Sequence, residues 1–173
     1  SGGNYMAGSA YEPGSGSTIL SYSGGICGPQ DLQGFKTDTY FHAISIQEMT
    51  TYIAGTGSTC GTHDNTGNAP PTVNAGANRI IPARTSFTLL GQASDPNGDP
   101  LTFTWEQFDR GQAWTTTSLP NTDLGDNPIF RSYPPNGDLF RTFPSPTNQF
   151  AAKGESLPTT NRTLHFRLTA RDG

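Results

Sequence analysis

The sequence predicts a mainly β fold with a single short α-helix in its first third. The chain has 173 residues, of which only 32% are apolar and 14% charged, and Gly and Pro together make up about a fifth. Such a composition is poor in helix formers and rich in turn residues. Several runs alternate apolar and polar residues with the period of a strand, whereas only one stretch has helical spacing. These features exclude a helical bundle or a coiled coil.

Charge and hydropathy narrow the range of partners. The net charge is −4, which argues against a nucleic-acid-binding surface. The longest apolar runs are only a few residues long, too short to span a membrane. The 10 Phe, 6 Tyr and 2 Trp residues can anchor a core. We therefore expect a folded protein that binds no nucleic acid and has no membrane span.

The composition changes near residue 65. Residues 61–71 show no apolar periodicity, contain several Gly and Asn residues, and end in Pro70 and Pro71. This pattern is typical of a linker. We therefore divide the chain into a Gly-rich segment (residues 1–64), a linker (65–71) and a β-rich segment (72–173).

The helix is predicted over residues 45–54. Ser45 is a good N-cap, and Glu48 three residues later completes a capping box. Gly55 ends the helix. One face carries an apolar stripe of Ile46, Met49, Tyr52 and Ile53. Because ten residues are too few for a stable isolated helix, we expect this one to dock on another part of the protein.

Strands are predicted in the rest of the chain. The main runs are residues 72–81, 86–93, 101–106 and 164–170, with shorter ones at 129–133 and 140–143. In the clearest run, Leu101, Phe103 and Trp105 face one way, and Thr102, Thr104 and Glu106 face the other. Strands separated by turn signals, with a Trp on the third, predict a β-sandwich of the immunoglobulin type.

The two cysteines, Cys27 and Cys60, predict an exported protein with one disulfide. Low charge, abundant Ser, Thr, Gly and Asn, and an even Cys count favour this interpretation. The bridge would stabilise the fold by roughly 3–4 kcal/mol through loop closure. The alternatives are two unpaired buried thiols, or Cys27 acting as a nucleophile with His42.

The residues of a catalytic centre are missing from the sequence. The three histidines, His42, His63 and His165, match no metal-binding spacing, and there is no His-Glu-x-x-His pair. No serine lies in a Gly-x-Ser-x-Gly elbow. We therefore assign no catalytic residue and no zinc ligand within the chain.

A turn at residues 95–100 offers oxygen ligands. Asp95, Asn97 and Asp99 occupy alternate positions, an arrangement that suits Ca²⁺, and Asp172 could approach the same loop. The alternative is a plain turn in which these side chains accept hydrogen bonds from backbone amides. The sequence is compatible with both a calcium site and a plain turn.

One segment resembles a known family. Residues 10–24 contain Gly-Ser-Thr-Ile-Leu-Ser-Tyr, which resembles the Met-turn region, Gly-Ser-Thr-Ile-Met-Ser-Tyr, of reprolysin-like bacterial zinc metallopeptidases of the metzincin group. Residues 27–33 and 40–46 resemble the loop after that turn and the C-terminal helix of the same family. The resemblance covers roughly residues 4–60. The Met-turn residues are Thr18, Ile19, Leu20, Ser21 and Tyr22.

The resemblance implies a parent that is a secreted, zinc-dependent metalloendopeptidase acting on protein or peptide substrates. The family's zinc helix, which supplies the ligands and the general base, would lie before residue 1. This chain alone should be inactive. Leu20 stands where the family has Met, a nearly isosteric exchange that cores tolerate. Tyr22 either shapes the substrate pocket or packs beside the turn.

A second resemblance concerns the β-rich segment. Residues 94–105 resemble the corresponding loop and strand of PKD-like and cadherin-like modules of exported bacterial proteins. In that family another strand follows the segment that matches residues 164–173. We therefore expect a sandwich that lacks its last strand, or one whose edge another element fills.

Two further expectations follow. Leu20 and the helix stripe would normally pack on the rest of a peptidase domain, so we expect exposed apolar surface and self-association. The alternative function is a non-catalytic exported adhesion or substrate-binding module. Its aromatic residues would stack on sugar rings, contact protein or fill the core: Trp114, Tyr133, Phe140 and Phe143.

Overall fold

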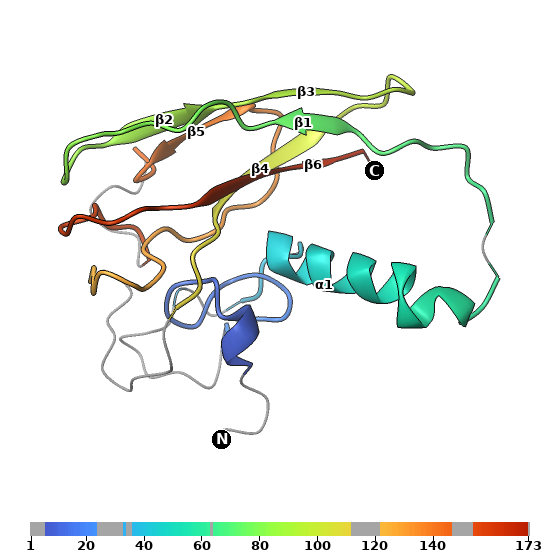
Figure 1. The fold of residues 1–173 in the computed structure, drawn as a ribbon, viewed down its shortest axis with the longest axis horizontal. Coiled ribbons are helices and arrows are strands. Elements are labelled where there is room, and N and C mark those ends of the chain that lie inside the picture. The colour runs from blue at the N-terminus through green and yellow to red at the C-terminus, as the bar shows by residue number, and fades with distance from the viewer. Residues whose placement is uncertain are drawn as a thin grey trace.

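The computed structural model describes residues 6–23, 33, 36–62, 64–111, 122–146 and 154–172. These residues form small β-sheets with one α-helix, which confirms the mainly β class (Figure 1). The elements are η1 (Ala7–Ser9), α1 (Ala43–Ala54), η2 (Thr56–Thr59), β1 (Thr72–Asn74), β2 (Phe87–Leu90), β3 (Gln92–Ser94), β4 (Thr102–Gln107), β5 (Phe140–Phe143) and β6 (Phe166–Arg171).

The six strands of the described residues pair as three two-stranded antiparallel sheets: β1 with β3, β2 with β5, and β4 with β6. The β4–β6 ladder is the longest and runs from the pair Thr102–Arg171 to the pair Gln107–Phe166. Figure 1 shows β1, β2, β3 and β5 along one side of the molecule, with the β4–β6 pair beside them.

Three predicted strands are wrong in their extent. The first is only β1, because a turn follows it in which the Asn74 side chain accepts from the Gly76 amide, and Gly76 has φ +79°. The second is divided into β2 and β3 at Gly91, where the Leu168 side chain approaches the backbone too closely for a Cβ. The predicted strand at 129–133 is only an isolated bridge between Phe130 and Glu155.

The core lies between the strands. Trp105, Ile129, Phe130 and Phe143 are buried, and Phe87 and Leu89 of β2 pack against them. Leu90, which the alternation places on the opposite face of β2, is exposed. Side chains of β2 thus alternate between the core and solvent, and Trp105 of β4 lies in the core. Phe143 has no exposed surface, so of the roles expected for the aromatic residues it fills the core.

Helix α1 begins at Ala43, two residues before the predicted start. Its N-cap is His42, whose Nδ1 accepts from the Ile44 amide at 3.2 Å. The predicted capping box is therefore wrong: Ser45 lies inside the helix and is buried, and Glu48 accepts a hydrogen bond from Ser9 instead. The Ala43 amide, an N-terminal donor without a partner in the helix itself, finds one in the Glu106 carboxylate. The end at Gly55 is as predicted, since its amide donates to Thr51 and Tyr52.

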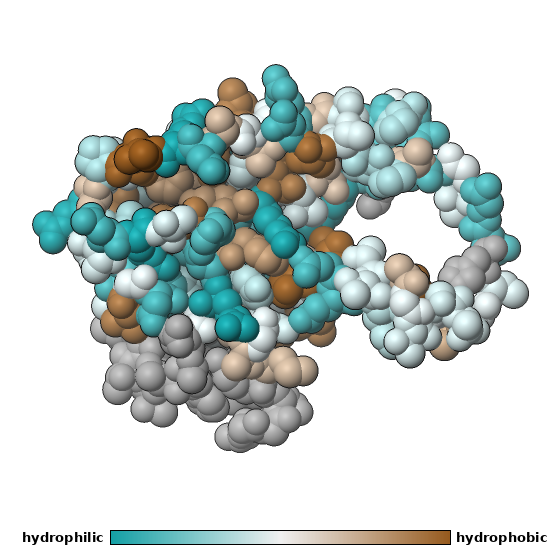
Figure 2. Space-filling view, in the orientation of Figure 1, coloured by the Kyte–Doolittle hydropathy of each residue, from teal (hydrophilic) through white to brown (hydrophobic). Residues whose placement is uncertain are grey.

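Only the first turn of α1 is buried. Ala43, Ile44 and Ser45 pack inward, whereas Tyr52 and Ile53 are 60% and 56% exposed. Residues 64–71 form neither helix nor strand, and Figure 2 shows an opening between the C-terminal end of α1 and the sheets. No helix among the residues described has the length and apolar character to cross a membrane.

The predicted exposed apolar surface is present. Besides the end of α1, Met6 and Leu20 are each 70% exposed. Both belong to the segment before the linker. Self-association through this surface stays a prediction, which light scattering across a concentration series tests.

Candidate functional site

The segment predicted as a Met-turn, residues 18–22, is a tight turn that leaves its apolar side chain, Leu20, exposed. The Ser21 amide donates to the Thr18 carbonyl at 3.1 Å, and the Ser21 hydroxyl donates to the same oxygen at 2.7 Å. Thr18 is buried, whereas Leu20 at the tip is exposed. Tyr22 is half-buried and its amide donates to the Ser15 carbonyl at 2.9 Å. The turn thus holds Leu20 toward solvent on a buried base.

The Glu12 carboxylate stabilises this turn through hydrogen bonds. Its Oε1 accepts from the amides of Ser17 at 2.9 Å and Thr18 at 3.2 Å, and its Oε2 accepts from the Thr18 hydroxyl at 2.6 Å. Gly16 is required beside it, because φ is +67° and a Cβ would lie 2.9 Å from Glu12 Oε2. Sequence reasoning missed the role of Glu12. A carboxylate five residues before two backbone donors in a Gly/Ser turn was the available signal.

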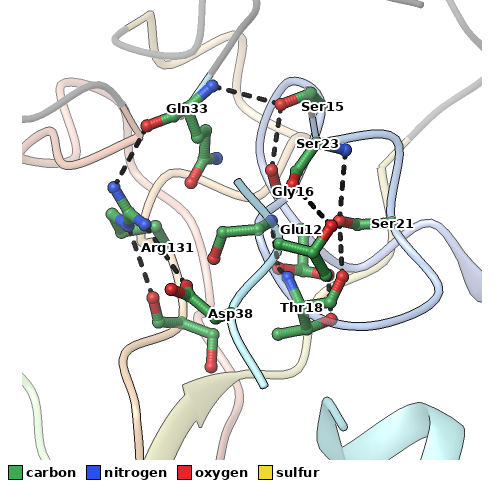
Figure 3. A network of polar contacts seen from close by, with 12 residues as sticks. Glu12, Ser15, Gly16, Thr18, Ser21, Ser23, Gln33, Asp38 and Arg131 are labelled. Carbon is green, nitrogen blue, oxygen red and sulfur yellow. Dashed lines mark hydrogen bonds and ion pairs between the residues drawn. The ribbon is translucent and has the colours of Figure 1, made fainter. Parts of the chain in front are cut away.

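A chain of polar contacts leads from the turn toward the β-rich segment (Figure 3). The Ser15 hydroxyl accepts from the Gln33 amide at 3.1 Å, and the Gln33 carbonyl accepts from Arg131 at 3.5 Å. Arg131 also lies 3.7 Å from the Asp38 carboxylate. The Asp38 amide donates to the Ser17 carbonyl at 2.7 Å, so Asp38 connects Arg131 with the residue before the turn.

Glu106 forms the buried contact between α1 and β4. It is fully buried; its Oε2 accepts from the Ala43 amide at 2.9 Å, and its Oε1 accepts from the Ser132 hydroxyl at 2.5 Å. His42 Nε2 lies 3.7 Å from the same Oε1. The face of β4 opposite Trp105, which carries Thr104 and Glu106, is therefore covered by the front segment. The short helix was expected to dock on another part of the protein, and it docks with its first turn on this face of β4.

Neighbouring residues extend this contact. Arg171 of β6 donates to the Phe41 carbonyl at 3.0 Å and to the Thr104 hydroxyl at 2.7 Å. Tyr11 packs on Phe108 with ring centroids 4.4 Å apart. The Gly-rich segment and the β-rich segment thus share a packed interface in spite of the linker between them.

His42, Glu106 and Ser132 do not form a catalytic triad, although their residue types would allow one. All three are at most 3% exposed, so no substrate reaches them. His42 Nδ1 is an acceptor for a backbone amide, and Ser132 donates to Glu106 rather than to the imidazole. Geometry and burial make this cluster a structural one.

Burial shifts the ionisation of both titratable groups at this contact. It raises the pKa of the Glu106 carboxyl above its ordinary value. It lowers the pKa of His42 to about 4, with the charges of Arg171 and Arg167 acting in the same direction and Glu12 opposing them. His42 is therefore neutral near pH 7, as its role as a hydrogen-bond acceptor requires.

We expect acid to destabilise the protein through His42. Its folded-state pKa of about 4 lies below the ordinary 6.5, so its contribution is complete above pH 6.5 and is lost as the pH falls toward 4. The free energy of unfolding, measured by urea denaturation at pH 7 and pH 4.5, should fall.

The matched variant is His42→Asn, which keeps a capping acceptor but does not titrate. Glu106, whose shift has the opposite sign, is present in both proteins, so the difference between them isolates His42. The variant should lose less stability between the two pH values. Equal losses would contradict the assignment.

Three of the predicted calcium ligands, Asp95, Asn97 and Asp172, use their side-chain oxygens to accept hydrogen bonds from the turn backbone or from the linker. Asp95 Oδ1 accepts from the amides of Asn97 at 2.8 Å and Asp99 at 3.0 Å. Asn97 Oδ1 accepts from the Ala69 amide at 2.8 Å, and Asp172 accepts from Asn68 at 2.9 Å. This geometry matches the plain-turn alternative. Across the described parts of the chain, no group of three or more His, Cys, Asp and Glu residues could hold a metal ion. Calcium binding stays a prediction.

The structure describes only some of the remaining predicted site residues. Cys60 is exposed and free, and Cys27 lies outside the described residues, so the disulfide stays a prediction that the structure does not show. Trp114 and His63 also lie outside them. His165 is exposed and lies 2.6 Å from Asp109.

No family model, no curated protein and no solved structure matches the chain.

Proposed function

We propose that this chain is the C-terminal part of a secreted bacterial zinc-dependent metalloendopeptidase, joined to a PKD/Ig-like module. One observation carries the proposal: the 18–22 turn holds Leu20 outward on a base fixed by Glu12. This is what a supporting turn under a metal site requires, namely an apolar side chain in a fixed position whose cover comes from elsewhere. The motif resemblance over residues 4–60 supports the same conclusion.

The chain itself supplies no donor set for zinc among the residues described, so its part in peptide hydrolysis is support and positioning. When bound in the parent protein, zinc acts as a Lewis acid and activates a water molecule. Leu20 would contribute an apolar floor, and Glu12 would keep the turn from moving. Tyr22, half-buried beside Leu20, would border the site of the protein or peptide substrate. No catalytic step is assigned to a residue of this chain.

Residues 72–172 serve in this proposal as a PKD/Ig-like module. The support is the mainly β content, the burial of Trp105 in the core, and the match of residues 94–105 to that family's loop and strand. The module would hold α1 through the Glu106 contact and the supporting turn through Arg131, which contacts Gln33 and Asp38. As an exported protein, it would act outside the cell.

The test is a longer protein that includes the residues encoded before Ser1. The proposal expects that sequence to contain His-Glu-x-x-His-x-x-Gly-x-x-His, and expects the longer protein to cleave casein in a chelator-sensitive way. Replacing Leu20 with Asp should lower kcat/KM at least about tenfold, because a charge would then lie under the metal site.

Two controls keep this test specific. Leu20→Met should leave activity unchanged, and Leu124→Asp, which alters another exposed leucine, in the β-rich segment, should do the same. An upstream sequence without any His-Glu-x-x-His would reject the proposal. Equal loss in Leu20→Asp and Leu124→Asp would remove the turn from its assigned role.

A further inference from the structure

A groove of about 400 Å³ lies between β4, the segment 133–138 and β5. Its lining combines ring side chains with exposed polar groups. The lining residues include Tyr133, Pro134, Asn136, Asp138, Phe140 and Arg141. We call it the β4–β5 groove.

The apolar part of the groove is an exposed ring platform. Phe140 is 52% exposed although it belongs to a strand. Its neighbour across the ladder, Leu90, is 59% exposed but does not line the groove. The ring of Tyr133 is held by two guanidinium groups, those of Arg131 at 5.1 Å and Arg141 at 4.7 Å. The platform is therefore largely preformed.

Two planar polar side chains stand beside these rings. Asn136 and Asp138 are exposed, and the side-chain oxygen Oδ1 of Asn136 accepts from the Asp138 amide at 2.8 Å, which fixes the Asn136 side chain against the backbone of residue 138. Among the residues that the structure describes, neither the Asp138 carboxylate nor the Asn136 amide nitrogen has a side-chain hydrogen-bond partner. Both can bind a hydroxyl group, the first as an acceptor and the second as a donor.

The charge of the groove disfavours an anionic ligand. Arg141 pairs with Glu155 at 2.7 Å, and its other contacts go to the carbonyls of Trp105 and Arg131, each at 2.6 Å. Its positive charge is thus compensated inside the protein. The exposed charge that remains on the groove wall is the negative one of Asp138.

An added peptide strand is disfavoured as well. Both backbone groups of Phe103 on this edge of β4 bond to Asn136, and the Trp105 carbonyl accepts from Arg141. Strand addition depends on free backbone donors and acceptors along an edge. Recognition in this groove must therefore use side chains.

We propose that the β4–β5 groove binds a neutral oligosaccharide. The C–H face of a sugar ring would pack on Phe140, and its hydroxyl groups would bind Asp138 and Asn136. Apolar ring contacts joined to a few well-placed polar groups are the usual composition of a small-molecule site. The inference does not depend on the metallopeptidase proposal, since it concerns residues of the β-rich segment alone.

The test is calorimetric titration of the 173-residue chain with cellohexaose, xylohexaose and N-acetylchitohexaose, and with hexagalacturonate and a Pro-Gly-rich hexapeptide for comparison. We expect at least one neutral hexasaccharide to bind. We expect neither the acidic hexagalacturonate nor the hexapeptide to bind. Phe140→Ala and Asp138→Asn should each weaken binding at least about tenfold. Leu90→Ala, the cross-strand control, should leave it unchanged.

Because all three substitutions are at exposed positions, circular dichroism should show each variant folded. Three results would overturn the proposal: no binding of any neutral hexasaccharide, binding of the peptide or the acidic sugar instead, or equal affinity in Phe140→Ala and Leu90→Ala. None of them bears on zinc or proteolysis, so this proposal fails or stands separately.

Discussion

Replacing Glu106 with alanine should destabilise the protein by about 3–5 kcal/mol and release the front segment from β4. The substitution removes the acceptor of the Ala43 amide and of the Ser132 hydroxyl, both buried. Loss of the carboxylate would leave both donors without the acceptor that they have in the folded protein. Urea denaturation followed by tryptophan fluorescence gives the free energy of unfolding, since Trp105 lies on the same strand.

Two variants calibrate that result. Glu106→Gln keeps one acceptor oxygen and should lose clearly less stability than Glu106→Ala. Thr102→Ala alters an exposed residue of the same strand and should change stability by no more than about 0.5 kcal/mol. If Glu106→Ala behaved like Thr102→Ala, the contact between α1 and β4 would not hold the front segment.

The second large effect is expected from Phe143→Ala, at about 3–5 kcal/mol. Phe143 has no exposed surface, and its ring centroid lies 4.7 Å from that of Phe166, 5.1 Å from Phe130 and 5.3 Å from Phe87. Truncation leaves a cavity among rings that cannot collapse into it without moving strands. The thermal midpoint and the urea midpoint should both fall.

The matched control is Phe140→Ala, the same change at the other end of β5. Phe140 is half exposed and lies outside the core cluster, so it should cost less than about 1 kcal/mol. Equal destabilisation by the two substitutions would show that the core is not where the structure places it.

Local patterns predicted what depends on neighbours in the sequence. The alternation of β2, the burial of Trp105 and the end of α1 at Gly55 follow from side-chain period and from glycine at a helix end. The extent of β1 could also have been predicted. Asn74 and Gly76 form a local turn, and an Asn two residues before a Gly is a turn signal.

What the sequence could not predict depends on residues far apart. The capping box at Ser45 is a sound local rule, but Ala43 bonds to Glu106, 63 residues away. That contact moves the helix start and makes His42 the cap. A strand residue such as Glu106, on the polar side of an alternating run, carries no local sign of complete burial. Tertiary contacts decide such cases.

The candidate site divides in the same way. The resemblance of residues 10–24 to a Met-turn region predicted a turn at 18–22, and Leu20 is exposed at its tip. The hydrogen bonds from Ser17 and Thr18 to Glu12 were missed, although a carboxylate shortly before a Gly/Ser turn was a local signal for them. The β4–β5 groove joins segments that lie about thirty residues apart in the chain, and only folding brings them together.

The central claim is that this chain supports a metal site whose ligands lie elsewhere. Titrating Zn²⁺ into the 173-residue chain by calorimetry, with peptide hydrolysis measured on the same samples, tests it most directly. The account predicts no tight stoichiometric zinc site and no zinc-dependent cleavage. A single tight zinc site within these residues, accompanied by cleavage that a chelator abolishes, would contradict it.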